Sequence, residues 1–203
     1  VAEPVAEPVA EPVAEPVAEP VAEPVAEPVA EPVAQPEGET PLTDSTISQA
    51  IDDWIAGGDA KDAVISTYGT IENWNTSQVT SMYRLIYNRT SFNDDISSWD
   101  VSNVTNMYRA FFGCQAFNQD ISSWNVSNVT DMDFAFYKCY AFNQDISSWN
   151  VSNVTTMEGM FHRATSFNQP IGSWDVSKVT DMEWMFIDAV AFNQDIGLWD
   201  VSN

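Results

Sequence analysis

Two cysteines and one histidine are the side chains of this sequence with the most reactive chemistry. Cys114 and Cys139 are the only cysteines and lie 25 residues apart. If they occupy equivalent places on adjacent turns of a repeat, an oxidising compartment would allow a disulfide, whereas two free buried thiols filling small-residue positions are the alternative. His162 stands alone at a variable position, which predicts a surface residue rather than a metal ligand.

Acidic residues recur at fixed spacing and would form ladders if successive repeats stack. One set is Asp95, Asp120, Asp145 and Asp195, and a second is Asp100, Asp175 and Asp200. Calcium between the repeats is one interpretation; hydrogen bonding to turn amides, beside an interior amide ladder of Asn93 and its equivalents, is the other. Because no metal-ligand spacing, phosphate loop or nucleophile motif occurs, we predict no cofactor, no metal and no enzymatic activity.

Asn-x-Ser/Thr sequons predict N-glycosylation if a eukaryote secretes this chain. They begin at Asn75, Asn88, Asn103, Asn125, Asn128, Asn150 and Asn153. Most arise from the repeat motif itself and are also candidates for structural ladder residues. Asn88 differs, since its equivalents are Gly113, Lys138, Arg163 and Asp188, a polar and variable series that indicates exposure.

A 25-residue period governs the chain from about residue 71 onward. Tryptophan recurs without exception at Trp74, Trp99, Trp124, Trp149, Trp174 and Trp199. Ile, Val, Met and Phe keep the same period, so we predict that the tryptophans form a core ladder. An exposed aromatic row that stacks on sugar rings is the alternative.

Each unit has two halves that predict the fold class. In one half, such as 117–126, Ile, Trp and Val are spaced as in a short strand, whereas 129–136 has near-helical spacing. One strand and one helical turn cannot bury their apolar faces alone, so successive units must stack. We therefore predict an α/β repeat, a right-handed solenoid with parallel strands on one side and short helical segments on the other.

The repeat Phe-Asn-Gln-Asp-Ile-Ser-Ser-Trp-(Asp/Asn)-Val-Ser-Asn-Val-Thr-x-Met resembles that of BspA-like leucine-rich repeat surface proteins. The resemblance covers about residues 69–203. It implies an extracellular, leucine-rich-repeat-like solenoid used in surface structure or adhesion, without implying a ligand.

The N-terminal third of the chain differs in composition. Residues 1–36 are Val-Ala-Glu-Pro repeats that end in Val-Ala-Gln-Pro, and a proline at every fourth position favours an extended polyproline II stalk. Residues 37–70 form a linker and an N-terminal helical cap, with a capping box from Thr46 and an apolar stripe that ends at Gly57. The solenoid occupies 71–203 and stops partway through a unit, so we expect it to be truncated.

Charge and hydropathy limit the classes of partner. The formal charge is −23, which argues against nucleic acid, and no apolar run is long enough to span a bilayer. We predict a non-catalytic structural subunit of an extracellular filament, appendage or surface layer that self-assembles or binds other surface proteins. The alternative is a cell-surface adhesin, a solenoid displayed on a stalk that binds carbohydrate or protein.

Overall fold

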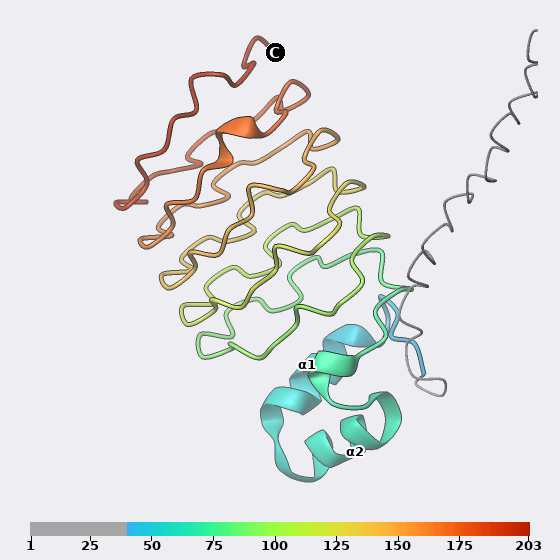
Figure 1. Ribbon diagram of the computed structural model, residues 1–203. Coiled ribbons are helices and arrows are strands. Elements are labelled where there is room, and N and C mark those ends of the chain that lie inside the picture. Colours follow the sequence, from blue (N-terminus) through green and yellow to red (C-terminus); the bar gives the residue numbers. More distant parts are fainter. Residues whose placement is uncertain (1–39) are drawn as a thin grey trace, which may run out of the picture. The chain divides into compact units, whose positions relative to one another are not determined.

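The computed structural model describes residues 40–203 (Figure 1). Two α-helices, α1 (Ile47–Ala56) and α2 (Gly58–Tyr68), lie at one end, and the 25-residue units follow as stacked coils. The 3₁₀-helices η1 (Ile71–Asn73) and η2 (Ile171–Ser173) are single turns within the coils. The Val-Ala-Glu-Pro tract and its predicted polyproline II conformation lie outside the described residues.

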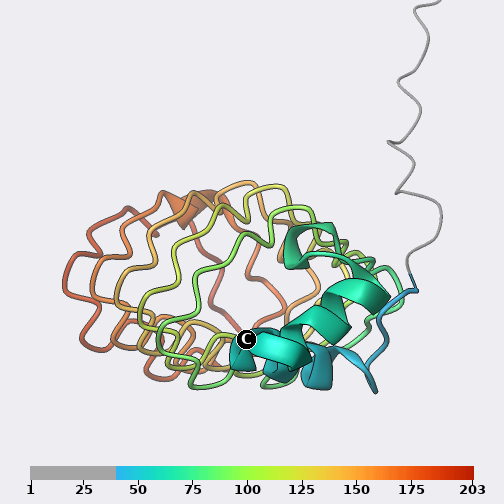
Figure 2. The same cartoon turned by 90° about the horizontal axis from the view of Figure 1, so that it is seen from below.

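The predicted fold class is wrong. Between residues 40 and 203 no strand forms, and the coils contain no α-helix. Neighbouring coils share only isolated parallel bridges, such as Ser81 with Asn106 and Asn106 with Asp131. The coils therefore stack, as Figures 1 and 2 show, but they form neither the parallel sheet nor the short helices of a leucine-rich-repeat solenoid.

Local turns prevent strands from forming in the first half of each unit. In the coil that contains Trp124, the Trp124 amide donates to the Ile121 carbonyl at 3.2 Å and the Val129 amide to the Val126 carbonyl at 2.9 Å. The Ser122 amide donates to the Asp120 carboxylate at 2.9 Å. Amides used in such turns are not available to a continuous ladder, so the backbone follows a chain of turns despite its strand-like spacing.

A different arrangement replaces the predicted helix in the second half. Alternate amides point along the stack: the amides of Arg109 and Phe111 donate to the Asp133 and Ala135 carbonyls of the next coil, each at 2.9 Å. The intervening Phe112 amide closes a local turn on Arg109 at 3.2 Å. Arg109 has φ 54° and Phe134 has φ 53°, so left-handed residues interrupt helical geometry in each coil.

The interior of the stack is apolar and continuous from α1 to the last coils. Like side chains lie above one another: Trp74 and Trp99 stack with ring centroids 5.8 Å apart, and Phe111 and Phe136 lie 5.4 Å apart. Because each coil buries its apolar residues only against its neighbours, the stack behaves as one cooperative core.

Helix α1 covers the first coil. It buries Ile47, Ala50, Ile51 and Trp54, and the Trp54 ring meets Trp74 edge-on at 5.9 Å. The predicted capping box does not form, because the Thr46 hydroxyl accepts from the Thr43 amide instead. Among the described residues, no helix has the length and apolar character that crossing a membrane would need.

Candidate functional site

The recurring tryptophans lie inside the stack. Trp74, Trp99, Trp124, Trp149 and Trp174 are buried, and Trp199 in the last coil is partly buried. The Trp124 indole N–H donates to the Ile96 carbonyl of the preceding coil at 3.2 Å, and Trp149 donates to Ile121 at 3.0 Å. Each indole thus fills the core and satisfies a carbonyl of its neighbour, which leaves no aromatic row here for sugars.

Cys114 and Cys139 are buried free thiols in this structure. The Cys114 thiol donates to the Ile86 carbonyl at 2.9 Å, and the Cys139 thiol donates to Phe111 at 3.0 Å. Burial raises the pKa of Cys114 to about 12 and raises the pKa of Cys139 well above its ordinary value. Both side chains therefore stay protonated at neutral pH and are poor nucleophiles.

The recurring aspartates cap turns. The carboxylates of Asp95 and Asp145 accept from the amides of Ser97 and Ser147 at 2.9 and 3.0 Å. The Ser122 hydroxyl and amide lower the pKa of Asp120 in the same way. No group of three or more His, Cys, Asp or Glu between residues 40 and 203 could hold a metal ion.

The amide ladder forms, but most of its members are exposed rather than interior. The Asn118 and Asn143 amides donate to the side-chain oxygens of Asn93 and Asn118 at 2.8 and 2.9 Å. Asn168 and Asn193 continue the ladder at 2.9 and 2.8 Å. Asn93, Asn118 and Asn143 are all exposed, so the ladder runs along the surface of the stack.

The sequons divide into three groups. Asn103, Asn128 and Asn153 each donate Nδ2 to a serine carbonyl of the preceding coil, at 2.9, 2.7 and 2.8 Å. In Asn75, Asn125 and Asn150 the Oδ1 atom instead accepts from a serine amide two residues later, at 3.2 Å in each case.

The third group is Asn88 alone, which is exposed at φ 57°. Its side chain lies over Gly113, where a Cβ atom would collide with it. Glycine at 113 therefore makes room for Asn88.

A partly exposed aromatic and basic surface lies on the variable half of the first three coils. We call it the aromatic–basic face, and it consists of Tyr83, Arg84, Tyr87, Tyr108, Arg109, Phe112, Phe134, Tyr137 and Lys138. Tyr83 and Tyr108 stack at 5.2 Å, and a second column of Tyr87, Phe112 and Tyr137 steps at 4.9 and 4.3 Å.

Cations lie over these rings. Arg84 is 4.2 Å from the Tyr87 ring centroid, and Arg109 lies between Tyr108, Phe112 and Phe134 at 4.9 to 5.2 Å. The Arg109 Nε atom is buried and has no hydrogen-bond partner within the described part of the chain. His162, expected at the surface, is half-buried and meets Tyr137 edge-on at 4.8 Å, at the end of the second column.

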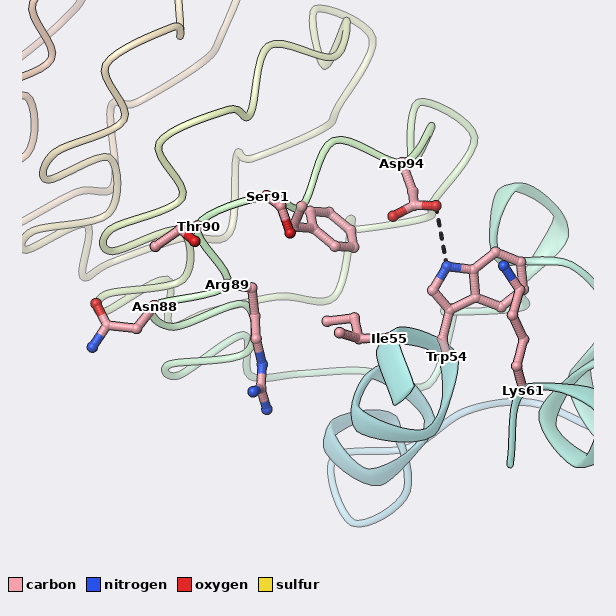
Figure 3. A pocket seen from close by; sticks show the side chains of 9 residues that line it. Trp54, Ile55, Lys61, Asn88, Arg89, Thr90, Ser91 and Asp94 are labelled. Atoms are coloured by element: carbon pink, nitrogen blue, oxygen red, sulfur yellow. Dashed lines mark hydrogen bonds between the residues drawn. The ribbon is translucent and has the colours of Figure 1, made fainter. Parts of the chain in front are cut away.

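An open cleft of about 450 Å³ separates α1 from the first coil (Figure 3). Its lining residues are largely those that attach the cap. The Trp54 indole donates to Asp94 at 3.1 Å, Lys61 lies 3.6 Å from the Trp54 ring centroid, and Arg89 pairs with Asp52. Asp94 stands where later coils have glutamine, and Arg89 where they have Cys or Ala, so these exceptions to the repeat are explained by contact with the helices.

Sequence reasoning missed the aromatic–basic face as a unit. Tyr83 and Arg84 recur as Tyr108 and Arg109, but the third and later coils have other residues at these positions, so the 25-residue period does not mark the face over the whole stack. The available signal was the position of the basic residues, because Arg84, Arg109 and Lys138 all fall in the variable half of the repeat.

The family described as Mycoplasma protein of unknown function, DUF285, matches residues 60–155 and 124–203. Together these segments cover the stacked coils and more than half of the chain. No curated protein and no solved structure matches this chain. This family match does not confirm the resemblance to BspA-like leucine-rich repeat proteins. The chain belongs to the DUF285 family of Mycoplasma proteins of unknown function.

Proposed function

We propose that this chain is a non-catalytic structural subunit of an extracellular filament, appendage or surface layer, in which the coil stack is a rigid spacer. The ladder contacts carry this proposal. Tryptophan indoles, asparagine side chains and threonine hydroxyls each donate to the preceding coil, for example Thr130 to Thr105 at 3.2 Å. Such contacts repeat at each step and resist sliding or bending of one coil against the next.

The repeated geometry is also poorly suited to catalysis. Near-identical coils place the same residue types beside one another at each repeated position, whereas an active site needs different groups converging at one place. The resemblance of the repeat motif to that of BspA-like surface proteins supports a role at the cell surface.

Self-association of the full chain tests this proposal. Analytical ultracentrifugation over a wide concentration range, followed by negative-stain electron microscopy, should show oligomers or filaments that grow with concentration. A monomer at every concentration would contradict the proposal.

A second candidate is an adhesin in which the stack displays a ligand-binding surface. The observation that favours it is the aromatic–basic face, because the coil-to-coil variation of the sequence falls where aromatic rings and cations are partly exposed. Calorimetric titration of the full chain with acidic oligosaccharides tests it. Binding that Arg84→Gln and Arg109→Gln abolish, by a chain that stays monomeric, would favour the adhesin over the structural subunit.

A further inference from the structure

We infer that the aromatic–basic face binds an acidic, proline-rich segment, namely the Val-Ala-Glu-Pro tract of a second copy of this chain. The inference rests on the self-assembly in the proposed function and names its contact surface. Charge and ring chemistry support it independently.

The charges of the two surfaces are complementary. Residues 1–36 contain eight Glu and no Lys or Arg, whereas three of the chain's seven basic residues lie on the aromatic–basic face. Within residues 40–203 the ion pairs are Arg89 with Asp52 and Arg163 with Asp188, so Arg84, Arg109 and Lys138 lack a carboxylate partner. The unpartnered Nε of Arg109 offers a donor to an incoming carboxylate.

The rings suit proline. Proline-rich segments in polyproline II conformation bind surfaces lined by aromatic side chains, because the ring packs flat and the extended chain loses little entropy on binding. Tyr83, which is 55% exposed, and the column of Tyr87, Phe112 and Tyr137 form two aromatic strips that run from coil to coil. A proline of the tract would pack its ring against these strips.

The spacing limits how much of the tract this face can contact. If the tract is in polyproline II conformation, which rises about 3.1 Å per residue, successive Glu residues would lie about 12 Å apart. The rings of Tyr87, Phe112 and Tyr137 step at 4.9 and 4.3 Å. Each ring step is less than half of that repeat, so the three coils would face about one four-residue unit, and we place its Glu beside Arg84 and Arg109.

The chemistry of the later coils sets the end of the site. Asp133, Glu158 and Glu183 occupy the positions that Tyr83 and Tyr108 hold in the first two coils. Burial raises the pKa of Glu158, and nearby acidic residues raise it further. An acidic segment would be repelled by these carboxylates, so we centre the contact on the first two coils and place Lys138 of the third coil at its edge.

Calorimetric titration of the full chain with a synthetic (Val-Ala-Glu-Pro)₅ peptide tests the inference. The matched control is (Val-Ala-Gln-Pro)₅, whose unit occurs at residues 33–36 and differs only in charge. We expect the Glu peptide to bind at least about tenfold more tightly, and the difference to shrink at about 0.5 M salt. Equal affinities of the two peptides would overturn the inference.

Two double variants locate the contact. Arg84→Gln with Arg109→Gln should weaken peptide binding at least about tenfold, because both cations of the aromatic–basic face in the first two coils are lost. Lys61→Gln with Lys178→Gln removes the same charge elsewhere and should change binding less than about twofold. Tyr83→Ala is a further variant at an exposed side chain and should also weaken binding. Equal losses in the two double variants would mean that only net charge matters, which contradicts a specific site.

Ultracentrifugation separates this inference from the proposed function. If both hold, the Glu peptide should dissociate oligomers of the full chain and the Gln peptide should not. Two results together would support self-assembly but contradict binding at the aromatic–basic face. These are oligomers that persist in the Arg84→Gln, Arg109→Gln variant and a normal chain that does not bind the peptide. Binding of an acidic oligosaccharide but not of the peptide would likewise reject the inference and assign the face to glycans.

Discussion

The two halves of each coil follow different rules. The half that contains Trp124 is nearly the same in every unit, and residues 116–130 are identical in sequence to 141–155. The half that contains Arg109 and Phe112 changes from coil to coil. In the first half, side chains bond to the preceding coil or fill the core, whereas in the second half partly buried side chains also contact one another near the surface.

This difference separates stability from recognition. In the repeated half, each side chain packs against the equivalent side chains of the coils before and after it, so a substitution disturbs two neighbours at once. In the variable half the backbone amides carry the contacts between coils, as when the Arg109 amide donates to the Asp133 carbonyl. Side chains there that do not fill the core are free to vary, and variation at exposed positions indicates binding rather than packing.

The largest expected effect is loss of an indole from the repeated half. Trp124→Ala should lower the free energy of unfolding by about 3–5 kcal/mol, because it leaves a cavity between two coils and removes the indole hydrogen bond to the Ile96 carbonyl. Chemical denaturation measures this change. The control is Trp184→Ala in the variable half, where the side chain is 48% exposed and the expected loss is below about 1 kcal/mol. Similar losses in both variants would remove the distinction between the halves.

Acid should weaken the repeated half through its turn aspartates. Hydrogen bonds from Ser97, Ser122 and Ser147 hold the pKa values of Asp95, Asp120 and Asp145 below the ordinary value of 3.8. A lowered pKa in the folded state stabilises the protein above the unfolded value, and this contribution is lost as pH falls through the folded value.

Replacement of these three aspartates by asparagine removes the titrating carboxylates but keeps the caps, since asparagine caps the same kind of turn at Asn125 and Asn150. Between pH 7 and about pH 3, the normal chain should lose more thermal stability than the triple variant. Equal pH dependence in both would show that the turn carboxylates contribute nothing.

A smaller loss is expected from the amide ladder. Asn118→Ala removes the oxygen that accepts from the Asn143 amide and should cost about 0.5–1.5 kcal/mol of unfolding free energy. Asn193→Ala is the matched control, because within residues 40–203 the Asn193 side-chain oxygen accepts no hydrogen bond while its backbone amide still bonds to Asn168. Equal stability of the two variants would mean that a hydrogen bond to water replaces the ladder bond without loss of unfolding free energy.

The smallest effect on stability is expected from glycans. Their distribution over the sequons tests which asparagine side chains are accessible. In a chain secreted from eukaryotic cells, we expect Asn88, Asn125 and Asn150 to be modified. Asn103, Asn128 and Asn153 should stay largely bare, because the Nδ2 atom that would carry the sugar is bonded to the preceding coil. Glycopeptide mapping measures this distribution, and full occupancy at Asn128 with a bare Asn88 would contradict it.

The sequence predicts which residues stack better than it predicts backbone conformation. The 25-residue period places Trp74 beside Trp99 and Phe111 beside Phe136, because identical residues at a fixed interval become neighbours in any stacked repeat. The period does not distinguish a strand from a chain of turns. Ile121, Trp124 and Val126 reach the core from turns, so their spacing suggested a strand that does not form.

The variable half was harder to predict. The apolar spacing of 129–136 resembles a helix, yet Phe134 adopts a left-handed conformation that propensity disfavours, because alternate amides bond to the next coil. The aromatic–basic face depends on this backbone, which brings Arg109 against rings from its own coil and from the next one. No local pattern in the sequence encodes such a contact.

Chemical-shift mapping tests the division of each coil most directly. In the isotopically labelled full chain, addition of (Val-Ala-Glu-Pro)₅ should shift backbone amides of the variable half in the first three coils, at 83–87, 108–112 and 134–138. Amides of the repeated half, such as 117–130 and 142–155, should not move. Shifts concentrated on the repeated half, or no shifts at all, would contradict the account.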